Sequence, residues 1–204
     1  MSKINHTFAI CAYKESKYLE ECIISLVNQS VKSNIIMVTS TPNSYIQNLA
    51  EQYNIPLVVN DGESGITQDW NYALANVTTK YATIAHQDDI YEADYTKSIL
   101  AGLESVRKPL IAFSDYSETR NGVKVYTNRM LKIKRLMLAP LRVKCFRNSR
   151  FVRRRSLSLG DAICCPSVCI CLDNVNRPVF NNKYRSCEDW EAWEKISRLR
   201  GAFV

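Results

Sequence analysis

The chain has 204 residues, of which 46% are hydrophobic and 23% are charged, and a formal net charge of +7. This composition is ordinary for a soluble globular protein with enough apolar residues to build a core. No stretch approaches the roughly 18 apolar residues that span a bilayer, and the apolar run 8–13 is far shorter than a signal peptide. We therefore expect one domain over residues 1–204, located in the cytoplasm.

The positive charge is concentrated in one segment. Between Lys124 and Arg155 there are 12 of the 27 basic residues and no acid, which leaves 15 basic against 20 acidic residues elsewhere. Segment 124–155, including Arg153, Arg154 and Arg155, is therefore expected to meet an anionic partner: a pyrophosphate, an acidic glycan or a membrane surface. The plainer alternative is a solvated helical face. Because few aromatic residues interleave with these cations and no RNA-binding motif is visible, nucleic acid is not expected as a partner.

Hydrophobic patterning predicts alternating strands and helices over the first ninety residues. Strands are predicted at 8–12, 35–38, 56–60 and 81–85. Ser16 is the predicted cap of the first of the three helices between them. Each helix presents an apolar face: Leu19, Cys22, Ile23, Leu26 and Val27 on the first, Ile46, Leu49 and Ala50 on the second, and Ile66, Trp70, Ala73 and Leu74 on the third. This alternation predicts an α/β fold with a mainly parallel sheet.

Ligands of such sheets bind outside the carboxyl ends of the strands. Three polar segments, 13–15, 39–41 and 86–89, follow predicted strands and should converge there. No Gly-x-Gly-x-x-Gly is present, so a dinucleotide site is not expected.

The second half is patterned less regularly. A helix is predicted at 95–106 and a strand at 110–114, whereas 121–158 lacks strand periodicity. Residues 160–171 have the pattern of a strand, a turn and a second strand. Residues 188–200 are typical of a helix, with acids in the first turn and cations in the last that complement the helix dipole. Residues 201–204 resemble the start of another strand, so a further carboxyl-terminal section is expected in relatives. An amphipathic face is predicted within 121–158 from Leu131, Leu136, Met137, Leu138 and Leu141.

The eight cysteines form no recognisable framework. They lie at positions 11, 22, 145, 164, 165, 169, 171 and 187, and in a reducing compartment they are expected to be buried thiols. The spacing of the cluster at 164–171 matches no common zinc pattern, and its alternation favours a buried strand.

Two adjacent acids, Asp88 and Asp89, directly follow the predicted strand 81–85. Neighbouring carboxylates repel each other unless a cation lies between them. Hard oxygen ligands favour Mg²⁺ or Mn²⁺, which could bridge the phosphates of a nucleoside diphosphate and neutralise a leaving group. The alternative is an acidic turn that caps the next helix.

Five segments, taken in order, resemble the inverting family 2 glycosyltransferases of GT-A (Rossmann-like) fold. They are Phe8-Ala-Ile-Cys-Ala-Tyr-Lys-Glu, Ile36-Met-Val-Thr-Ser-Thr, Gly65-Ile-Thr-Gln-Asp-Trp-Asn-Tyr-Ala, His86-Gln-Asp-Asp-Ile-Tyr and Cys187-Glu-Asp-Trp-Glu-Ala-Trp. The resemblance covers nearly the whole chain and is poorest over 121–158. It implies a nucleotide-sugar donor half, 1–95, and an acceptor and catalytic-base half, 96–204, with a glycan or lipid-linked acceptor.

The resemblance also implies roles for residues of the donor half. Tyr13, near Glu15, matches an aromatic that lies against the nucleotide base, although a core tyrosine is the alternative. Thr39 and Ser40 stand where many members have an aspartate that binds uracil. Gly65 matches a loop glycine beside the donor, and Asp69 could bind donor hydroxyls or be a helix-surface residue, as could Asn71. His86 and Gln87 would face ribose or sugar, with Asp88 as the metal ligand and Asp89 as its neighbour. His86 could instead be a metal ligand or a packed side chain.

Glu188 and Asp189 resemble the acidic motif that supplies the general base. Inverting transfer needs one base to take the acceptor proton, and we favour Asp189 over Glu188. The alternative is that both acids only favour the helix amino terminus, an effect of about 0.3–1 kcal/mol each.

Two other functions remain open from the residues alone. The protein could be a non-catalytic or degenerate nucleotide-sugar-binding protein, since the uracil-binding and first metal-motif carboxylates of the family are absent. A nucleotidyltransferase would normally have a glycine-rich phosphate loop near the first strand, and this chain has none.

Overall fold

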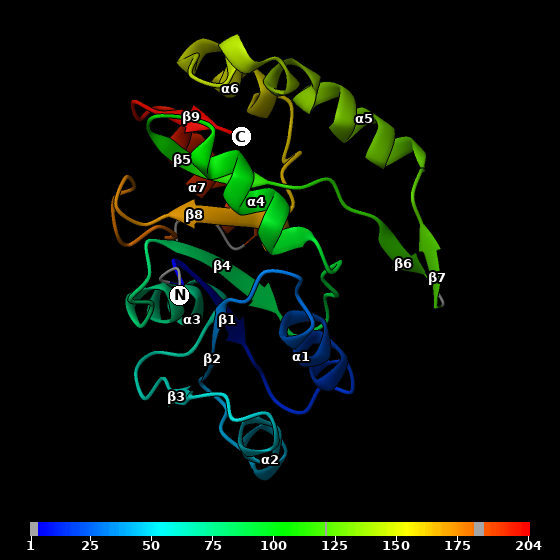
Figure 1. The fold of residues 1–204 in the computed structure, drawn as a ribbon, viewed down its shortest axis with the longest axis vertical. Helices are drawn as coiled ribbons and strands as arrows, with labels where there is room; N and C mark the ends of the chain where they lie inside the picture. The colour runs from blue at the N-terminus through cyan, green and yellow to red at the C-terminus, as the bar shows by residue number, and fades with distance from the viewer. Residues whose placement is uncertain (1–3, 121, 182–185) are drawn as a thin grey trace.

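A seven-stranded sheet forms the centre of the computed structural model, which describes residues 4–120, 122–181 and 186–204 (Figure 1). The strand order is β3-β2-β1-β4-β8-β5-β9, and β8 alone runs antiparallel to its neighbours. The predicted mainly parallel α/β sheet is therefore confirmed. The strands are β1 (His6–Cys11), β2 (Asn34–Thr39), β3 (Leu57–Val59), β4 (Tyr81–His86), β5 (Pro109–Phe113), β8 (Val168–Cys171) and β9 (Ala202–Phe203).

Helices cover both faces of this sheet, because the side chains of a strand alternate between its two faces. Phe8 and Ile10 of β1 belong to one apolar cluster together with residues of α1, α2 and α4. Ala9, between them, belongs to the opposite cluster, with residues of α3 and α7. The helices are α1 (Leu19–Val27), α2 (Ser44–Gln52), α3 (Ile66–Ala75), α4 (Tyr95–Glu104) and α7 (Glu188–Ser197).

The first helix and the cysteine cluster differ from their predictions. Helix α1 begins at Leu19, and its N-cap is Tyr18 rather than Ser16. Residues 160–171 contain one strand, β8, because Cys165–Ser167 form a 3-10 turn. Cys145 and Cys187 are exposed, so the expectation of buried thiols is wrong for these two. Residues 201–204 do enter a strand, β9, as predicted.

The described residues of segment 118–157 form a hairpin, at the right in Figure 1, and a set of helices at the end of the sheet that carries β5 and β9. The hairpin pairs β6 (Glu118–Arg120) with β7 (Val123–Val125), so the expectation of no strand there is wrong. Helix α5 (Arg129–Leu138) and helix α6 (Arg150–Leu157) follow, capped by the side chains of Asn128 and Ser149. Their amide and hydroxyl oxygens accept backbone N–H bonds, which fixes where each helix starts.

The predicted amphipathic face is only partly correct. Leu131 and Leu141 are buried, but Leu136 is 75% exposed. Met130 and Ile133 are also exposed on α5, and Phe151 on α6 is 74% exposed. The outward face of this segment therefore carries apolar side chains among its cations.

Arg153 differs most from its expected surface position, because its side chain is fully buried. Its guanidinium donates to the carbonyl oxygens of Ser197 (2.9 Å), Leu199 (2.7 Å), Arg147 (3.1 Å) and Gly201. The carbonyls of Ser197, Leu199 and Gly201 belong to the carboxyl end of α7 and the turn before β9, where unpaired oxygens favour a cation. Arg153 thus clamps α6 to the end of the chain, and it does not belong to the basic surface.

Candidate functional site

The loops that follow β1, β2 and β4 are joined to one another at the carboxyl edge of the sheet. The side-chain amide of Gln87 donates to the carbonyl of Tyr13 (3.1 Å) and accepts from its N–H (3.0 Å). The N–H of Lys14 donates to the hydroxyl of Thr41 (2.6 Å). The predicted convergence of segments 13–15, 39–41 and 86–89 is therefore confirmed.

Three potential metal ligands lie together at the end of β4. The nearest ligand atoms of His86, Asp88 and Asp89 all lie within 4.8 Å of one another, the only such group of three among the described residues. Burial, followed by the charge of Asp88, raises the pKa of Asp89 to about 6. Because 43% of the Asp89 side chain is exposed, water partly screens this repulsion. Two carboxylates and one imidazole are a donor set that fits Mg²⁺ or Mn²⁺.

His86 is held in place by an aromatic stack. Its ring lies on that of Trp70 with centroids 5.1 Å apart and an interplanar angle of 18°. Burial lowers the pKa of His86 despite the opposing charges of Asp88 and Asp189, which favours the neutral imidazole. Its Nε2 is buried without a hydrogen-bond partner among the described residues, so the neutral ring has one nitrogen left for a ligand. The role of Trp70 as the support of His86 was not predicted.

Asp69 lies in the first turn of α3, where both of its carboxylate oxygens are occupied. Oδ2 accepts from the hydroxyl of Ser40 (2.7 Å), and Oδ1 accepts from the amide of Asn60 (2.8 Å). Thr39 is fully buried, and its hydroxyl accepts from the N–H of Thr41 (3.0 Å). The structure thus brings Ser40 and Asp69 together, while the side chain of Thr39 is turned into the protein.

The remaining residues predicted for the donor half lie around this edge. Tyr13 is 50% exposed, and Glu15 is also exposed. Gly65 precedes α3 at a φ of +154°, where an added Cβ would collide with the side chain of Gln68. Asn71 instead holds segment 179–180, since its amide bonds the backbone of Val179 and Phe180. Asn71 therefore has a structural role on α3.

The predicted base lies at the start of α7. Glu188 and Asp189 are both half-buried in the first turn, and the N–H of Trp190 donates to Oδ1 of Asp189 (2.9 Å). The indole of Trp190 is anchored to the carbonyl of Leu157 (2.8 Å). The charge of Asp189 is near enough to His86 to act on the pKa of its imidazole.

Comparison with known proteins decides the family. The model of the glycosyl transferase family 2 matches residues 7–175, which include every element of the donor edge. The chain belongs to glycosyl transferase family 2. A curated protein from Haemophilus influenzae, described as an uncharacterized glycosyltransferase, is 22% identical over 209 residues, which cover 93% of this chain and 59% of that protein.

Solved structures of other glycosyltransferases share the fold. The mannosyltransferase PcManGT from Pyrobaculum calidifontis, in complex with GDP-Man and Mn²⁺, has a TM-score of 0.71 at 13% identity, covering 100% of this chain and 55% of that one. TarS from S. aureus in complex with UDP-GlcNAc has a TM-score of 0.67 at 17% identity. The match covers 98% of this chain and 56% of the TarS chain. The chain spans a little over half the length of these relatives.

Asp161 is a residue of this family 2 site that was not predicted. Burial, the charge of Asp189 and a side-chain hydrogen bond with Asp189 raise its pKa to about 7. Two neighbouring carboxyl groups cannot both ionise at no cost, so Asp161 keeps its proton to a higher pH than an exposed aspartate does. A signal was present in the sequence, since Asp161 is the only acid between Glu118 and Asp173. Its position next to Asp189 depends on tertiary folding.

Proposed function

We propose that this chain transfers a hexosyl group from a nucleoside-diphosphate sugar to an acceptor hydroxyl, with inversion and with help from Mg²⁺ or Mn²⁺. The observation that carries the proposal is the cluster of His86, Asp88 and Asp89 at the end of β4, and the charge of Asp189 near His86 supports it. PcManGT in complex with GDP-Man and Mn²⁺, and TarS in complex with UDP-GlcNAc, support a nucleotide-sugar donor.

Asp88 and Asp89, with His86 beside them, would hold the metal ion. When bound, such an ion neutralises charge on the diphosphate leaving group. Without it the two adjacent carboxylates repel each other, and the raised pKa of Asp89 reflects this repulsion together with burial. His86 stays neutral on Trp70, so it can donate a proton to an oxygen or offer a nitrogen lone pair.

The donor would lie across the three joined loops. The half-exposed ring of Tyr13 offers a face for the nucleotide base, and Glu15 lies two residues further along. Gly65 leaves room for close approach of the donor at the start of α3. Ser40 and Asp69 are bonded to each other, so they would bind sugar or ribose hydroxyls through their remaining lone pairs. The amide of Gln87 is used by Tyr13, and its contribution would be to position that residue.

Asp189 would act as the general base, with Glu188 as the alternative in the same turn. Its carboxylate takes the proton of the acceptor hydroxyl while the hydroxyl oxygen attacks the anomeric carbon from the side opposite the diphosphate. The new glycosidic bond forms as the bond to the diphosphate oxygen breaks, and the diphosphate leaves with that electron pair. One displacement inverts the anomeric centre. Residues 1–95 would thus bind the donor and 96–204 would bind the acceptor and supply the base.

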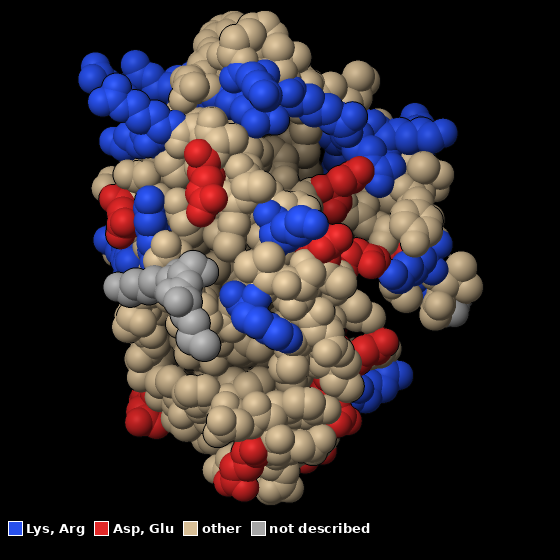
Figure 2. Space-filling view, viewed as in Figure 1, with Lys and Arg blue, Asp and Glu red and all other residues tan. Residues whose placement is uncertain are grey.

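The basic segment supports a lipid-linked acceptor or a glycan as the partner, and we propose that the chain works in the cytoplasm at the inner face of a membrane. Lys and Arg side chains spread over the end of the molecule formed by α5 and α6 (Figure 2). The exposed side chains of Ile133, Leu136 and Phe151 lie among these cations. Such a surface suits the boundary between anionic headgroups and acyl chains. No helix of the described residues is long and apolar enough to cross a membrane.

Vesicle sedimentation tests the membrane contact. We expect more binding to vesicles containing phosphatidylglycerol than to neutral ones, and loss of that difference as salt rises. Leu136→Ser should weaken binding, whereas Ile24→Ser, an exposed apolar change on α1, should not. Equal binding to charged and neutral vesicles would contradict an electrostatic contact.

A thermal-shift screen against nucleoside diphosphates and nucleotide sugars, with and without Mn²⁺, tests the donor. A ligand that binds only the folded protein raises its melting temperature by mass action. We expect a metal-dependent shift with one nucleotide class, followed by transfer or slow hydrolysis of the matching sugar donor. A shift without turnover would favour the degenerate binding protein, and no shift with any nucleotide would exclude both functions.

A further inference from the structure

A groove of about 710 Å³ lies between α6 and α7, and none of the proposed donor-site residues lines it. Its walls carry four arginines: Arg150, Arg154 and Arg155 of α6 and Arg198 at the end of α7. Glu194 is the only acid among the described residues that line the groove. The groove therefore has an excess of positive charge, and all of its cations are arginines.

Two of these arginines meet at one carboxylate. The Nε of Arg198 lies 2.9 Å from Oε1 of Glu194, and the Nε of Arg154 lies 3.4 Å from the same oxygen. Among the described residues, no hydrogen bond occupies the terminal Nη groups of either arginine. The two guanidinium groups, one from each helix, are therefore close enough to contact one phosphate together, and they have donors left for it.

The other two arginines of the groove are not neutralised. Arg150 lies one helical turn before Arg154 on the same face of α6, and Arg155 follows Arg154 directly. Both Arg150 and Arg155 are exposed, and neither side chain has a hydrogen bond or an ion pair among the described residues. Their charges add to those that meet at Glu194, so the whole groove attracts an anion.

Two contacts fix the spacing between the walls of the groove. The buried guanidinium of Arg153 donates to the carbonyls of Ser197 and Leu199 at the end of α7. At the other end of α6, the carbonyl of Leu157 accepts from the indole of Trp190, which lies in the first turn of α7. Helix α6 is thus joined to both ends of α7. The groove is preformed, so an anion can bind without the cost of ordering its walls.

Exposed apolar side chains border the arginines. Phe151 lines the groove and is 74% exposed, and Leu159, just beyond α6, is 85% exposed. Lys and Arg side chains gather at the same end of the molecule (Figure 2). Cations beside exposed aromatic and aliphatic side chains suit the boundary between anionic headgroups and acyl chains better than contact with a wholly polar anion.

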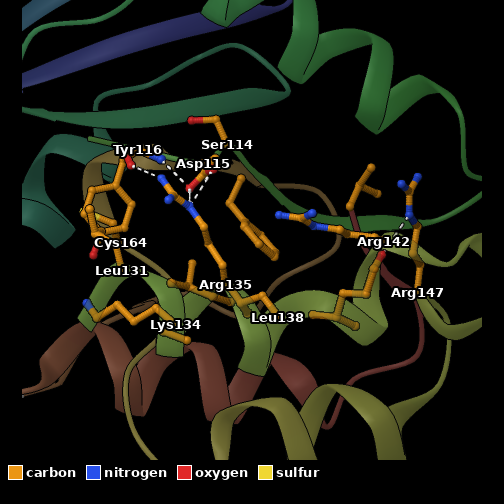
Figure 3. A pocket seen from close by; sticks show the side chains of 15 residues that line it. Ser114, Asp115, Tyr116, Leu131, Lys134, Arg135, Leu138, Arg142, Arg147 and Cys164 are labelled. Carbon is orange, nitrogen blue, oxygen red and sulfur yellow. Dashed lines mark hydrogen bonds and ion pairs between the residues drawn. The ribbon is translucent and has the colours of Figure 1, made fainter. Parts of the chain in front are cut away.

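A second cavity, of about 200 Å³ under α5, has no such convergence of cations (Figure 3). Its Arg135 is paired with Asp115, and in the figure Lys134 and Arg142 lie on opposite sides of that pair. The Nζ of Lys134 lies over the ring of Tyr116, 5.5 Å from its centroid. The cations of this cavity are therefore separated, whereas those of the groove converge.

We propose that the groove binds the phosphodiester headgroup of one anionic phospholipid, phosphatidylglycerol being the simplest, between Arg154 and Arg198. Guanidinium forks form paired hydrogen bonds with phosphate oxygens, which a lysine ammonium cannot do. Arg150 and Arg155 would attract the neighbouring headgroups, and the ring of Phe151 would enter the boundary of the acyl chains.

The bound lipid would hold the proposed base near the membrane surface. Asp189 lies on the same helix, nine residues before Arg198, which is about 14 Å along the helix axis. A lipid-linked acceptor in the same membrane would then reach the base without leaving the bilayer. The inference rests on the membrane contact of the proposed function and names the residues that make it, but it does not depend on sugar transfer.

Isothermal titration with dihexanoyl phosphatidylglycerol, below its critical micelle concentration, tests the site without a membrane surface. Arg154→Gln and Arg198→Gln should each raise the dissociation constant about tenfold, because each removes a charge-assisted contact. Arg142→Gln is the matched control, since it removes the same charge from an exposed arginine that does not line the groove. Phe151→Ser should weaken binding of this lipid but not of glycerol 3-phosphate, which has no acyl chain. Circular dichroism and the melting temperature show whether each variant is folded.

Sedimentation with phosphatidylcholine vesicles that contain phosphatidylglycerol extends the test to a membrane. Arg154→Gln and Arg198→Gln should lose most of the binding that the Arg142→Gln control retains. Equal binding by the variants and the control would overturn the proposal, and it would leave a contact spread over the whole basic segment. Failure of the wild type to bind these vesicles would refute the membrane contact itself.

Two soluble probes distinguish other occupants. If glycerol 3-phosphate bound as tightly as the lipid, the groove would belong to a soluble phosphate, and the proposal would be overturned. Binding of polygalacturonate that the two variants weaken, without binding of the lipid, would assign the groove to an acidic glycan and also overturn it. Affinity for the nucleoside diphosphate found in the thermal-shift screen should not change in any of these variants. Failure of the transferase proposal would therefore appear in that screen alone.

Discussion

The raised pKa of Asp161 predicts that one substitution stabilises the protein only at high pH. The pKa of Asp161 is raised from 3.8 to about 7, mainly by burial and then by Asp189. Asp161→Asn replaces the carboxyl with a neutral amide of similar shape that can still donate to Asp189. The variant therefore resembles the protonated wild type at every pH.

The sign follows from proton linkage. Between pH 4 and 7 the folded wild type keeps a proton on Asp161 that the unfolded chain has lost, so stability falls as the pH rises. Below pH 4 Asp161 is protonated in both the folded and the unfolded state. Above pH 7 it is ionised in both states, and the folded state then bears the full free-energy cost of its buried charge. The raised pKa corresponds to a loss of at most about 4 kcal/mol in the free energy of unfolding. Solvent access to the half-buried carboxyl reduces this loss to about 2 kcal/mol. Asp161→Asn should therefore gain about 2 kcal/mol over wild type at pH 8 and nothing at pH 4.

Urea denaturation at pH 4, 6 and 8 measures this difference. Asp61→Asn is the control, because Asp61 is an exposed acid in the loop after β3. The control should track wild type at all three pH values. If the advantage of Asp161→Asn over wild type changed by less than about 0.5 kcal/mol between pH 4 and pH 8, the raised pKa of Asp161 would be refuted.

Three further substitutions test the site and the fold. Asp88→Ala should abolish the Mn²⁺-dependent part of nucleotide binding; identical titrations with and without chelator in wild type would exclude a metal at this position. Asp189→Asn should leave donor binding intact and slow transfer by roughly 10²–10⁴-fold, the usual contribution of a general base; full activity would mean that the base lies elsewhere. Arg153→Met should lower the free energy of unfolding by about 4 kcal/mol, since four backbone carbonyls lose a charged donor. Exposed Arg155→Met should change it by no more than about 0.5 kcal/mol, and equal effects of these two changes in urea denaturation would contradict the clamp.

Much of the donor half was predictable because its signals are local. Strands such as β1 and β4 are short apolar runs that end abruptly at polar residues, and the helices between them repeat apolar residues at helical spacing. Parallel strands bring their carboxyl ends to one edge, so His86 and Asp88 were expected beside the loop at Tyr13. The bonds from Gln87 to Tyr13 confirm this placement.

The region after β5 was less predictable because the positions of its side chains depend on contacts with residues far away in the sequence. Arg153 sits in a run of arginines that is typical of a solvated face, yet carbonyls up to 48 positions away hold it in the core. Arg135 on α5 pairs with Asp115, 20 positions away, and no periodicity reports that pairing.

Order along the chain alone therefore determined the α/β alternation, the polar edge and the twin acids of the family motif, since each depends on neighbouring residues and on the geometry of a sheet. Only the tertiary structure decided that Asp161 meets Asp189, that Trp70 carries His86, and that Lys134 and Arg142 share a cavity. Burial and charge pairing act through space, and the spacing of two residues in a sequence does not report their distance in the fold.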